Sequence, residues 1–98
     1  MKSLNLLEKD IEGAVVTFAK SKGYYVRKFT SPSQRSVPDR IFLTPTGRTF
    51  FIEFKATGKK STPAQEIEQD KIRARHVLVF VVDNVAAGKK IVMEMLSL

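Results

Sequence analysis

The chain has 98 residues, a length that suits one domain spanning residues 1–98 with a single hydrophobic core. Its formal net charge of +7 favours a polyanionic partner, foremost nucleic acid, with an anionic membrane surface as the alternative. The absence of Cys excludes disulfides and thiolate metal sites. No apolar run approaches the roughly 20 residues of a membrane span, and the first residues do not resemble a signal peptide.

Residues 5–22 are predicted to form the first helix, with Asn5 as its N-cap and Glu8 three residues further on, as in a capping box. Gly23 suits the position just after the helix end. Glu12 lies beside the apolar stripe, where it can lean toward a sheet or pair with a Lys on the solvent side. The apolar stripe consists of Leu4, Leu7, Ile11, Ala14, Val15 and Phe18.

Residues 24–29 are predicted to form a strand, and residues 30–37 a polar loop. The loop is basic and rich in Ser, and it leads directly into Pro38-Asp39. It can bind backbone phosphates, or it can be an ordinary solvated connection.

Two apolar, β-rich runs at residues 37–43 and 49–55 are joined by a segment containing Pro and Gly, which predicts a hairpin. If the turn centres on Thr46-Gly47, paired positions sum to about 93, and Asp39 falls opposite Phe54. Glu53 and Lys55 share one face of the second strand because side chains alternate. The hairpin therefore gathers two carboxylates and an amine at one end.

The second strand of this hairpin is apolar on both faces, which predicts a central strand covered on both sides. Charged groups near the end of a buried strand are costly unless they are paired or bind a metal. The alternative is a structural pairing of Glu53 with Lys55, or of Asp39 with Arg40, on a solvated strand edge.

A basic loop at residues 56–61 precedes a helix that is predicted to run from Pro63 to about Ala74. Thr62 is the expected N-cap, and Gln65 is the expected reciprocal partner in a capping box. Gln65 can also reach toward the end of the hairpin that carries the charged groups.

Residues 77–82 form a continuous apolar run, which predicts a buried strand that is parallel to a neighbour across the preceding helix. Asp83-Asn84 ends this strand and can cap a last helix, which Gly88 interrupts. His76 is expected to mark a helix end rather than to act as a base. Four apolar residues are expected to cover the sheet or to support a dimer contact: Ile91, Val92, Met95 and Leu96. The element order α-β-β-β-α-β-α predicts an α/β sandwich on a mixed sheet.

Pro38-Asp39, followed by Glu53-x-Lys55 on the next strand, resembles the signature of the PD-(D/E)XK nucleases. Segments 37–42, 51–56 and 58–60, with a Gln opening the next helix, are similar to the virus-type replication-repair nuclease (VRR-NUC) domain over nearly the whole chain. The resemblance implies a restriction-endonuclease-like αβββαβ core in a stand-alone phage-type member. Ser36, and Arg75-His76 before the last core strand, stand where the family often has Gly.

The resemblance implies a catalytic set of Asp39, Glu53, Lys55, Glu12 and Gln65. Asp39 and Glu53 are expected to ligate Mg²⁺, or Mn²⁺ as its substitute, with the main-chain carbonyl of Phe54. Glu12, which precedes Gly23 at a spacing similar to that in archaeal Holliday-junction resolvases, is expected to assist as a metal ligand directly or through water. Lys55 is expected to orient or polarise the attacking water, and Gln65 to support the site.

The function implied is that of a metal-dependent endonuclease that hydrolyses phosphodiester bonds in branched DNA, as a Holliday-junction resolvase does. A homodimer in the cytoplasm of a bacterial host is expected, if the chain is viral, with no membrane and no small-molecule cofactor. Two alternatives remain: a non-catalytic nucleic-acid-binding module on the same fold, and a nuclease with sequence preference. Phosphate contacts are expected from the basic residues that flank the site in sequence: Lys28, Arg35, Arg40, Lys59 and Lys60.

Overall fold

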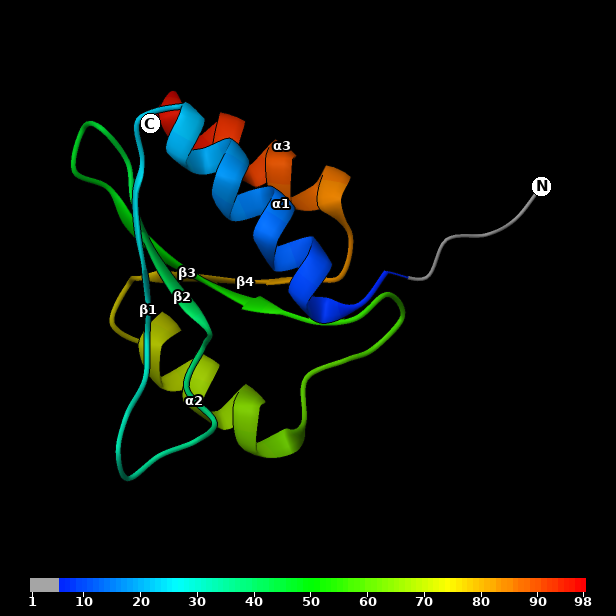
Figure 1. The fold of residues 1–98 in the computed structure, drawn as a ribbon. Coiled ribbons are helices and arrows are strands. Elements are labelled where there is room, and N and C mark those ends of the chain that lie inside the picture. The colour runs from blue at the N-terminus through cyan, green and yellow to red at the C-terminus, as the bar shows by residue number, and fades with distance from the viewer. Residues whose placement is uncertain (1–5) are drawn as a thin grey trace.

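The computed structural model describes residues 6–98 and shows a four-stranded mixed sheet between helices (Figure 1). The elements are α1 (Glu8–Ser21), β1 (Tyr25–Lys28), β2 (Arg40–Leu43), β3 (Thr49–Phe54), α2 (Pro63–Arg73), β4 (Leu78–Val82) and α3 (Val85–Leu96). The strand order is β1-β2-β3-β4, with antiparallel pairs except for the parallel pair β3–β4. Helices α1 and α3 cover one face of the sheet and α2 lies on the other. The predicted α/β class and αβββαβ core are confirmed. In the described part of the chain, no helix combines the length and apolarity needed to cross a membrane.

Helix α1 begins later than predicted. Its N-cap position is Leu7, whose side chain makes no capping hydrogen bond, and the predicted cap Asn5 and core residue Leu4 lie outside the described residues. Leu7 is 59% exposed, so its predicted place in the core is wrong, because it precedes the helix instead of lying on its apolar stripe. Gly23 follows the helix at φ +89°, a left-handed conformation that glycine adopts without steric cost, as predicted.

Strand β3 is the centre of the sheet, as its two apolar faces predicted. Every residue from Phe50 to Phe54 is buried, because β2 and β4 flank the strand and helices lie above and below it. Phe50, Ile52 and Phe54 belong to one core cluster, which also includes buried residues of α1 and α3.

The hairpin register differs by one residue from the prediction. Arg40 pairs with Ile52 and Leu43 pairs with Thr49, so paired positions sum to 92. The loop has three residues between Thr44 and Arg48, with Gly47 at φ +93° in its last position, instead of the two-residue turn that was assumed. Continuing the register by one step places Asp39 opposite Glu53 instead of Phe54.

Strand β4 is parallel to β3 across α2, as predicted, but it is only partly buried. Leu78 and Val81 are 47% and 41% exposed because β4 forms an edge of the sheet. His76 follows the end of α2, as predicted, and it adopts φ +65° where a glycine would be unstrained.

Helix α3 runs without a break through Gly88, with Asn84 accepting a hydrogen bond from the amide of Ala87 as its cap. Val92 and Met95 are buried against the sheet and α1. Ile91 and Leu96 pack at the margin of this core, so the predicted covering role is confirmed.

The close contact between α1 and α3 depends on the missing side chain of Gly88. A Cβ at this position would clash with a methyl group of Val15, a contact that forces the helices apart. Gly88→Ala is therefore expected to lower the free energy of unfolding by about 1–3 kcal/mol. Gly13→Ala in α1 is the matched control, because nothing lies within 4 Å of its added Cβ; we expect it to raise stability by up to about 1 kcal/mol. Urea unfolding measures both, and equal effects of the two changes would contradict the packing argument.

Candidate active site

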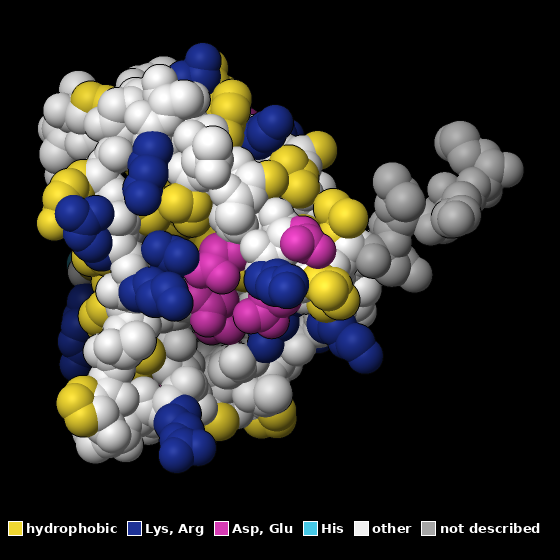
Figure 2. All heavy atoms as spheres, viewed as in Figure 1, with side chains coloured by type: hydrophobic (Ala, Val, Ile, Leu, Met, Phe, Trp, Pro, Cys, Tyr) yellow, Lys and Arg dark blue, Asp and Glu magenta, His cyan; other side chains and the backbone are white. Residues whose placement is uncertain are grey.

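Three charged side chains gather where β3 ends and β2 begins. Glu53 is 2% exposed and Lys55 is 9% exposed, while Asp39, the residue just before β2, is half-buried. The structure therefore brings together the two carboxylates and the amine that the hairpin predicted. Figure 2 shows a compact group of acidic side chains in the middle of one face, surrounded by Lys and Arg.

Asp39 is held between two strands by its main chain and its side chain. Its carbonyl accepts the amide of Phe29 at 2.9 Å, and its Oδ2 accepts the amide of Phe54 at 2.7 Å. The amide of Lys55 donates to the carbonyl of Val82 at 2.8 Å, which ties the end of β3 to β4. The carboxylate of Asp39 is thus fixed relative to the end of β3.

Gln65 performs both of the tasks that the sequence suggested. It completes a capping box with Thr62, whose hydroxyl accepts the Gln65 amide and whose own amide donates to Gln65 Oε1. The same Oε1 accepts Lys55 Nζ at 2.5 Å, and Gln65 Nε2 donates to Glu53 Oε2 at 3.3 Å. The start of α2 therefore fixes both polar side chains at the end of β3.

The two carboxylates are costly to ionise together. Burial first, and then the negative charge of Asp39, raise the pKa of Glu53 to about 8, against the opposing effect of Lys55, whose Nζ lies 3.8 Å away. Burial also raises the pKa of Asp39, although the hydrogen bond from the Phe54 amide opposes this. Ionisation of Glu53 next to Asp39 is therefore unfavourable at neutral pH.

The site has oxygen atoms that can serve as ligands of a divalent cation. Within the described residues, Glu53 Oε1 is buried without any hydrogen-bond partner, a costly state for a carboxylate oxygen. A cation beside it would satisfy this oxygen and relieve the repulsion between the carboxylates, and oxygen ligands suit Mg²⁺ and Mn²⁺. No three acidic or His side chains of residues 6–98 form a metal cage by themselves, so main-chain oxygen and water have to supply the remaining ligands.

Glu12 lies near this site but already has a partner. Its Oε2 accepts Arg40 Nε at 2.5 Å, and both side chains are about one-fifth exposed. Glu12 and Asp39 line the same pocket, and the negative charge of Glu12 contributes to the raised pKa of Asp39. The Asp39–Arg40 pairing considered as an alternative is replaced by this Glu12–Arg40 pair.

Comparisons with known proteins agree with this geometry. No family model matches the sequence. "Putative nuclease p44" of Acyrthosiphon pisum secondary endosymbiont phage 1 is 39% identical over 77 residues, which are 79% of this chain and 83% of the relative. A solved structure of a VRR_NUC domain superposes with a TM-score of 0.83 and 26% identity, covering 88% of this chain and 94% of the other. The chain belongs to the VRR-NUC family of nuclease domains.

One further acidic residue of this VRR-NUC domain lies near the site, although its sequence context predicts a capping role. Glu8 was predicted to be a capping partner, but it is the exposed first residue of α1, near enough to Asp39 and Lys55 for their charges to act on it. Burial first, and then the charge of Asp39, raise its pKa, while Lys55 opposes the shift. Its spacing of one helical turn from Glu12 is the signal that could have identified it, because such residues share a helix face.

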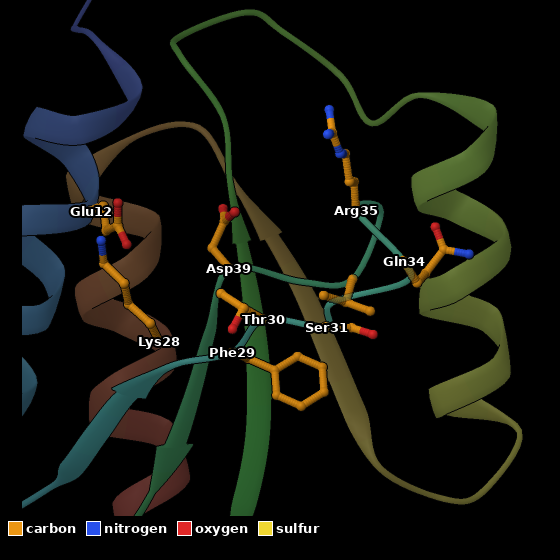
Figure 3. Close-up of a pocket in the computed structure, with 9 residues that line it drawn as sticks. Glu12, Lys28, Phe29, Thr30, Ser31, Gln34, Arg35 and Asp39 are labelled. Atoms are coloured by element: carbon orange, nitrogen blue, oxygen red, sulfur yellow. The ribbon is translucent and has the colours of Figure 1, made fainter.

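The basic residues of this VRR-NUC domain fall into three groups. Lys28 and Arg35 line a pocket of about 370 Å³ that Glu12 and Asp39 also border (Figure 3). Lys59 and Lys60 are exposed on the loop that follows β3. Arg40 donates its Nε to Glu12, and its predicted contact with phosphate stays a prediction.

Proposed function

We propose that this nuclease domain is a metal-dependent, structure-selective DNA endonuclease that cleaves branched DNA in the manner of a Holliday-junction resolvase. The observation that carries the proposal is the buried oxygen of Glu53, which has no partner within residues 6–98 and lies beside Asp39 and Lys55. Binding alone requires no such costly cluster, whereas hydrolysis of a phosphodiester uses each of its parts.

The carboxylates of Asp39 and Glu53, with the Phe54 carbonyl, would hold Mg²⁺ or Mn²⁺ in this proposal, and Glu12 and Glu8 would assist. The bound metal supplies a water of lowered pKa and neutralises charge on the phosphoryl group. Lys55 adds a fixed positive charge where negative charge develops on the phosphate, and Gln65 holds its ammonium in place.

Substrate binding in this proposal relies on phosphate contacts. Lys28 and Arg35 line the pocket that Asp39 borders, and Lys59 and Lys60 are exposed on the loop that follows β3. Contacts between such residues and phosphates give affinity without reading bases. Selectivity would therefore come from the shape of the DNA. Each chain offers one such site, so paired incisions on a junction call for two copies related by a two-fold axis. The phage origin of the relative favours action in the cytoplasm of a bacterial host.

A panel of labelled DNA substrates tests this proposal. The purified chain is incubated with a four-way junction, a linear duplex and a single strand of the same sequences in Mg²⁺. We expect symmetric paired incisions on the junction and little cleavage of the other two. Equal cutting of all three would reject the structure selectivity, and cutting at one sequence in every context would favour a sequence-dependent nuclease. Salt-sensitive binding without cleavage would favour a binding module.

A pair of variants separates the two tasks of Gln65. Thr62→Ala removes the N-cap hydroxyl, which accepts the main-chain amide of residue 65. Gln65→Ala keeps that bond but removes the reciprocal bond from the Thr62 amide, together with both contacts to Glu53 and Lys55. Both are expected to cost about 1 kcal/mol of stability. Only Gln65→Ala is expected to slow junction cleavage by about tenfold or more, because the Lys55 ammonium loses its support. Single-turnover cleavage rates of the two variants are measured at a temperature where both are folded. Equal rates would show that Gln65 contributes only to helix capping.

A further inference from the structure

A pocket beside the candidate active site has no task in the chemistry described so far. It is formed where β1 ends and the loop of residues 30–37 begins, and it has a volume of about 370 Å³ (Figure 3). Asp39 borders the pocket and also belongs to the acidic cluster, so a group bound there would lie next to the reacting phosphate. The lining residues are Glu12, Lys28, Phe29, Thr30, Ser31, Gln34, Arg35, Val37 and Asp39.

The walls of this pocket combine charge with hydrogen-bonding groups. Neither Lys28 nor Arg35 forms an ion pair within residues 6–98, and in Figure 3 they lie on opposite sides of Asp39. The negative charge of Glu12 is offset by Arg40, which makes the pocket more favourable for an anion. The hydroxyls of Thr30 and Ser31 add donors and acceptors on the loop side.

One wall of the pocket is aromatic and is held in place. The ring of Phe29 packs edge-on against Phe51, with ring centroids 4.9 Å apart, and it remains half-buried at the pocket. The main chain of Phe29 is also fixed, because its amide donates to the carbonyl of Asp39. A flat ring at a fixed position, with cations nearby, suits a base that stacks while its phosphate is neutralised.

We propose that this pocket binds one unpaired nucleotide of the DNA adjacent to the scissile phosphate, an inference that rests on the proposed endonuclease function. Its volume lies within the range of about 300–1,000 Å³ that is usual for small-molecule sites. That volume suits a single nucleotide and excludes a base pair that remains stacked in a duplex. The base packs on Phe29, and the adjoining phosphate lies near Lys28 and Arg35.

This placement gives a physical source for structure selectivity. A nucleotide has to leave its stack to enter the pocket, and the cost is smallest for one that is already unpaired. Branch points and single-stranded ends provide such nucleotides, whereas an intact duplex does not. The pocket thus favours branched DNA without reading a base sequence.

The first test measures binding without metal. The ¹⁵N-labelled chain in EDTA is titrated with a thymidine tetranucleotide, and separately with a tetramer of abasic residues that has the same phosphates. We expect shifts of the amide signals of Phe29, Thr30 and Ser31, and affinity about tenfold higher for the thymidine tetramer. Phe29→Leu, which keeps an apolar side chain, should remove this difference. Equal affinity for the two tetramers in the natural sequence would overturn the proposal.

A charge-matched pair controls for electrostatics in the same titration. Arg35→Gln changes the pocket, and Arg48→Gln removes the same charge from the exposed hairpin loop at the other end of the strands. Binding of the thymidine tetramer should fall by about tenfold for Arg35→Gln and should be unchanged for Arg48→Gln. Equal losses would show that only net charge matters, which contradicts a built pocket.

The second test uses cleavage, so that the pocket and the nuclease can fail separately. Nucleotides near the cut in a junction are replaced one at a time by abasic residues. We expect one position at which the replacement slows cleavage by about tenfold, an effect that Phe29→Leu abolishes. If no such position exists, the proposed nucleotide-binding pocket is rejected, while the proposed endonuclease function is retained. If no DNA is cleaved at all, the proposed function fails, and the tetramer titration still decides the pocket.

Discussion

Replacement of Lys55 with Met is expected to slow DNA cleavage at least about a hundredfold and to leave both the fold and the metal affinity intact. The Lys55 ammonium is buried, donates to Gln65 Oε1 at 2.5 Å and lies 3.8 Å from a Glu53 oxygen. A preorganised charge of this kind contributes by stabilising charge in the transition state, and loss of one such group typically costs about 10²–10³ in rate. The metal ligands Asp39 and Glu53 remain, and repulsion between the ammonium and the cation is removed.

This prediction is checked by single-turnover cleavage together with calorimetric titration of Mn²⁺. Lys90→Met on the exposed side of α3 is the control for the loss of one positive charge. Retention of the cleavage rate in Lys55→Met would exclude a role of the ammonium in the chemistry. Loss of Mn²⁺ binding together with cleavage would show instead that Lys55 supports the geometry of the ligands.

Replacement of Glu53 with Gln is expected to have opposite effects on stability and activity. A buried carboxylate next to Asp39 is costly to ionise, and Gln has the same shape without the charge. The metal-free variant should therefore be more stable than the natural sequence at pH 8. Its Mn²⁺ binding and its cleavage should both be lost, with a fall in rate of at least about a thousandfold, because a metal ligand is removed.

The raised pKa of Glu53 makes the free energy of unfolding fall as the pH rises. The folded-state pKa of Glu53 is about 8, above its ordinary value of 4.5, so the folded chain binds more protons than the unfolded chain between these values. The stability due to this proton is complete below pH 4.5 and is lost as the pH rises through 8. The slope approaches about 1.4 kcal/mol per pH unit for one proton, and Glu53→Gln should remove it.

Urea unfolding in EDTA from pH 5 to pH 9 measures this slope. Glu94→Gln on exposed α3 is the control for the same chemical change away from the site, and it should leave the slope unchanged. Added Mn²⁺ should stabilise the natural sequence most at high pH, because the metal replaces the proton of Glu53. A slope of the same size in Glu53→Gln would contradict the assignment of the titration to this carboxylate.

The parts of the site that depend on local patterns could be predicted from the sequence. Pro38-Asp39 and Glu53-x-Lys55 lie on two strands of one hairpin, so alternation and a short turn suffice to bring the charged groups together. Thr62-Pro63 and Gln65 predict the start of α2 because capping preferences act over three residues. The one-residue error in register did not separate Asp39 from Glu53, because adjacent positions at a strand end remain neighbours.

The parts that depend on packing between distant elements could not be predicted. The pairing of Glu12 with Arg40 joins α1 to β2, and no sequence pattern sets how a helix is rotated on a sheet. Glu8 was assigned to capping because the helix was expected to begin at Asn5, whereas its N-cap is Leu7. The edge position of β4 follows from strand order, and its continuous apolar run is equally typical of a central strand. The pocket at Phe29 could not be predicted because its shape depends on the course of the whole loop of residues 30–37.

Cleavage of a four-way junction shows whether this chain has a metal-dependent active site built on Asp39 and Glu53. The labelled junction is incubated with the natural sequence and with Glu53→Gln, in Mg²⁺, in Mn²⁺ and in EDTA, after circular dichroism has shown that both proteins are folded. We expect incision by the natural sequence in either metal, none in EDTA and none by Glu53→Gln under any condition. Incision in EDTA, or by Glu53→Gln at the natural rate, would contradict a metal-dependent site built on Asp39 and Glu53.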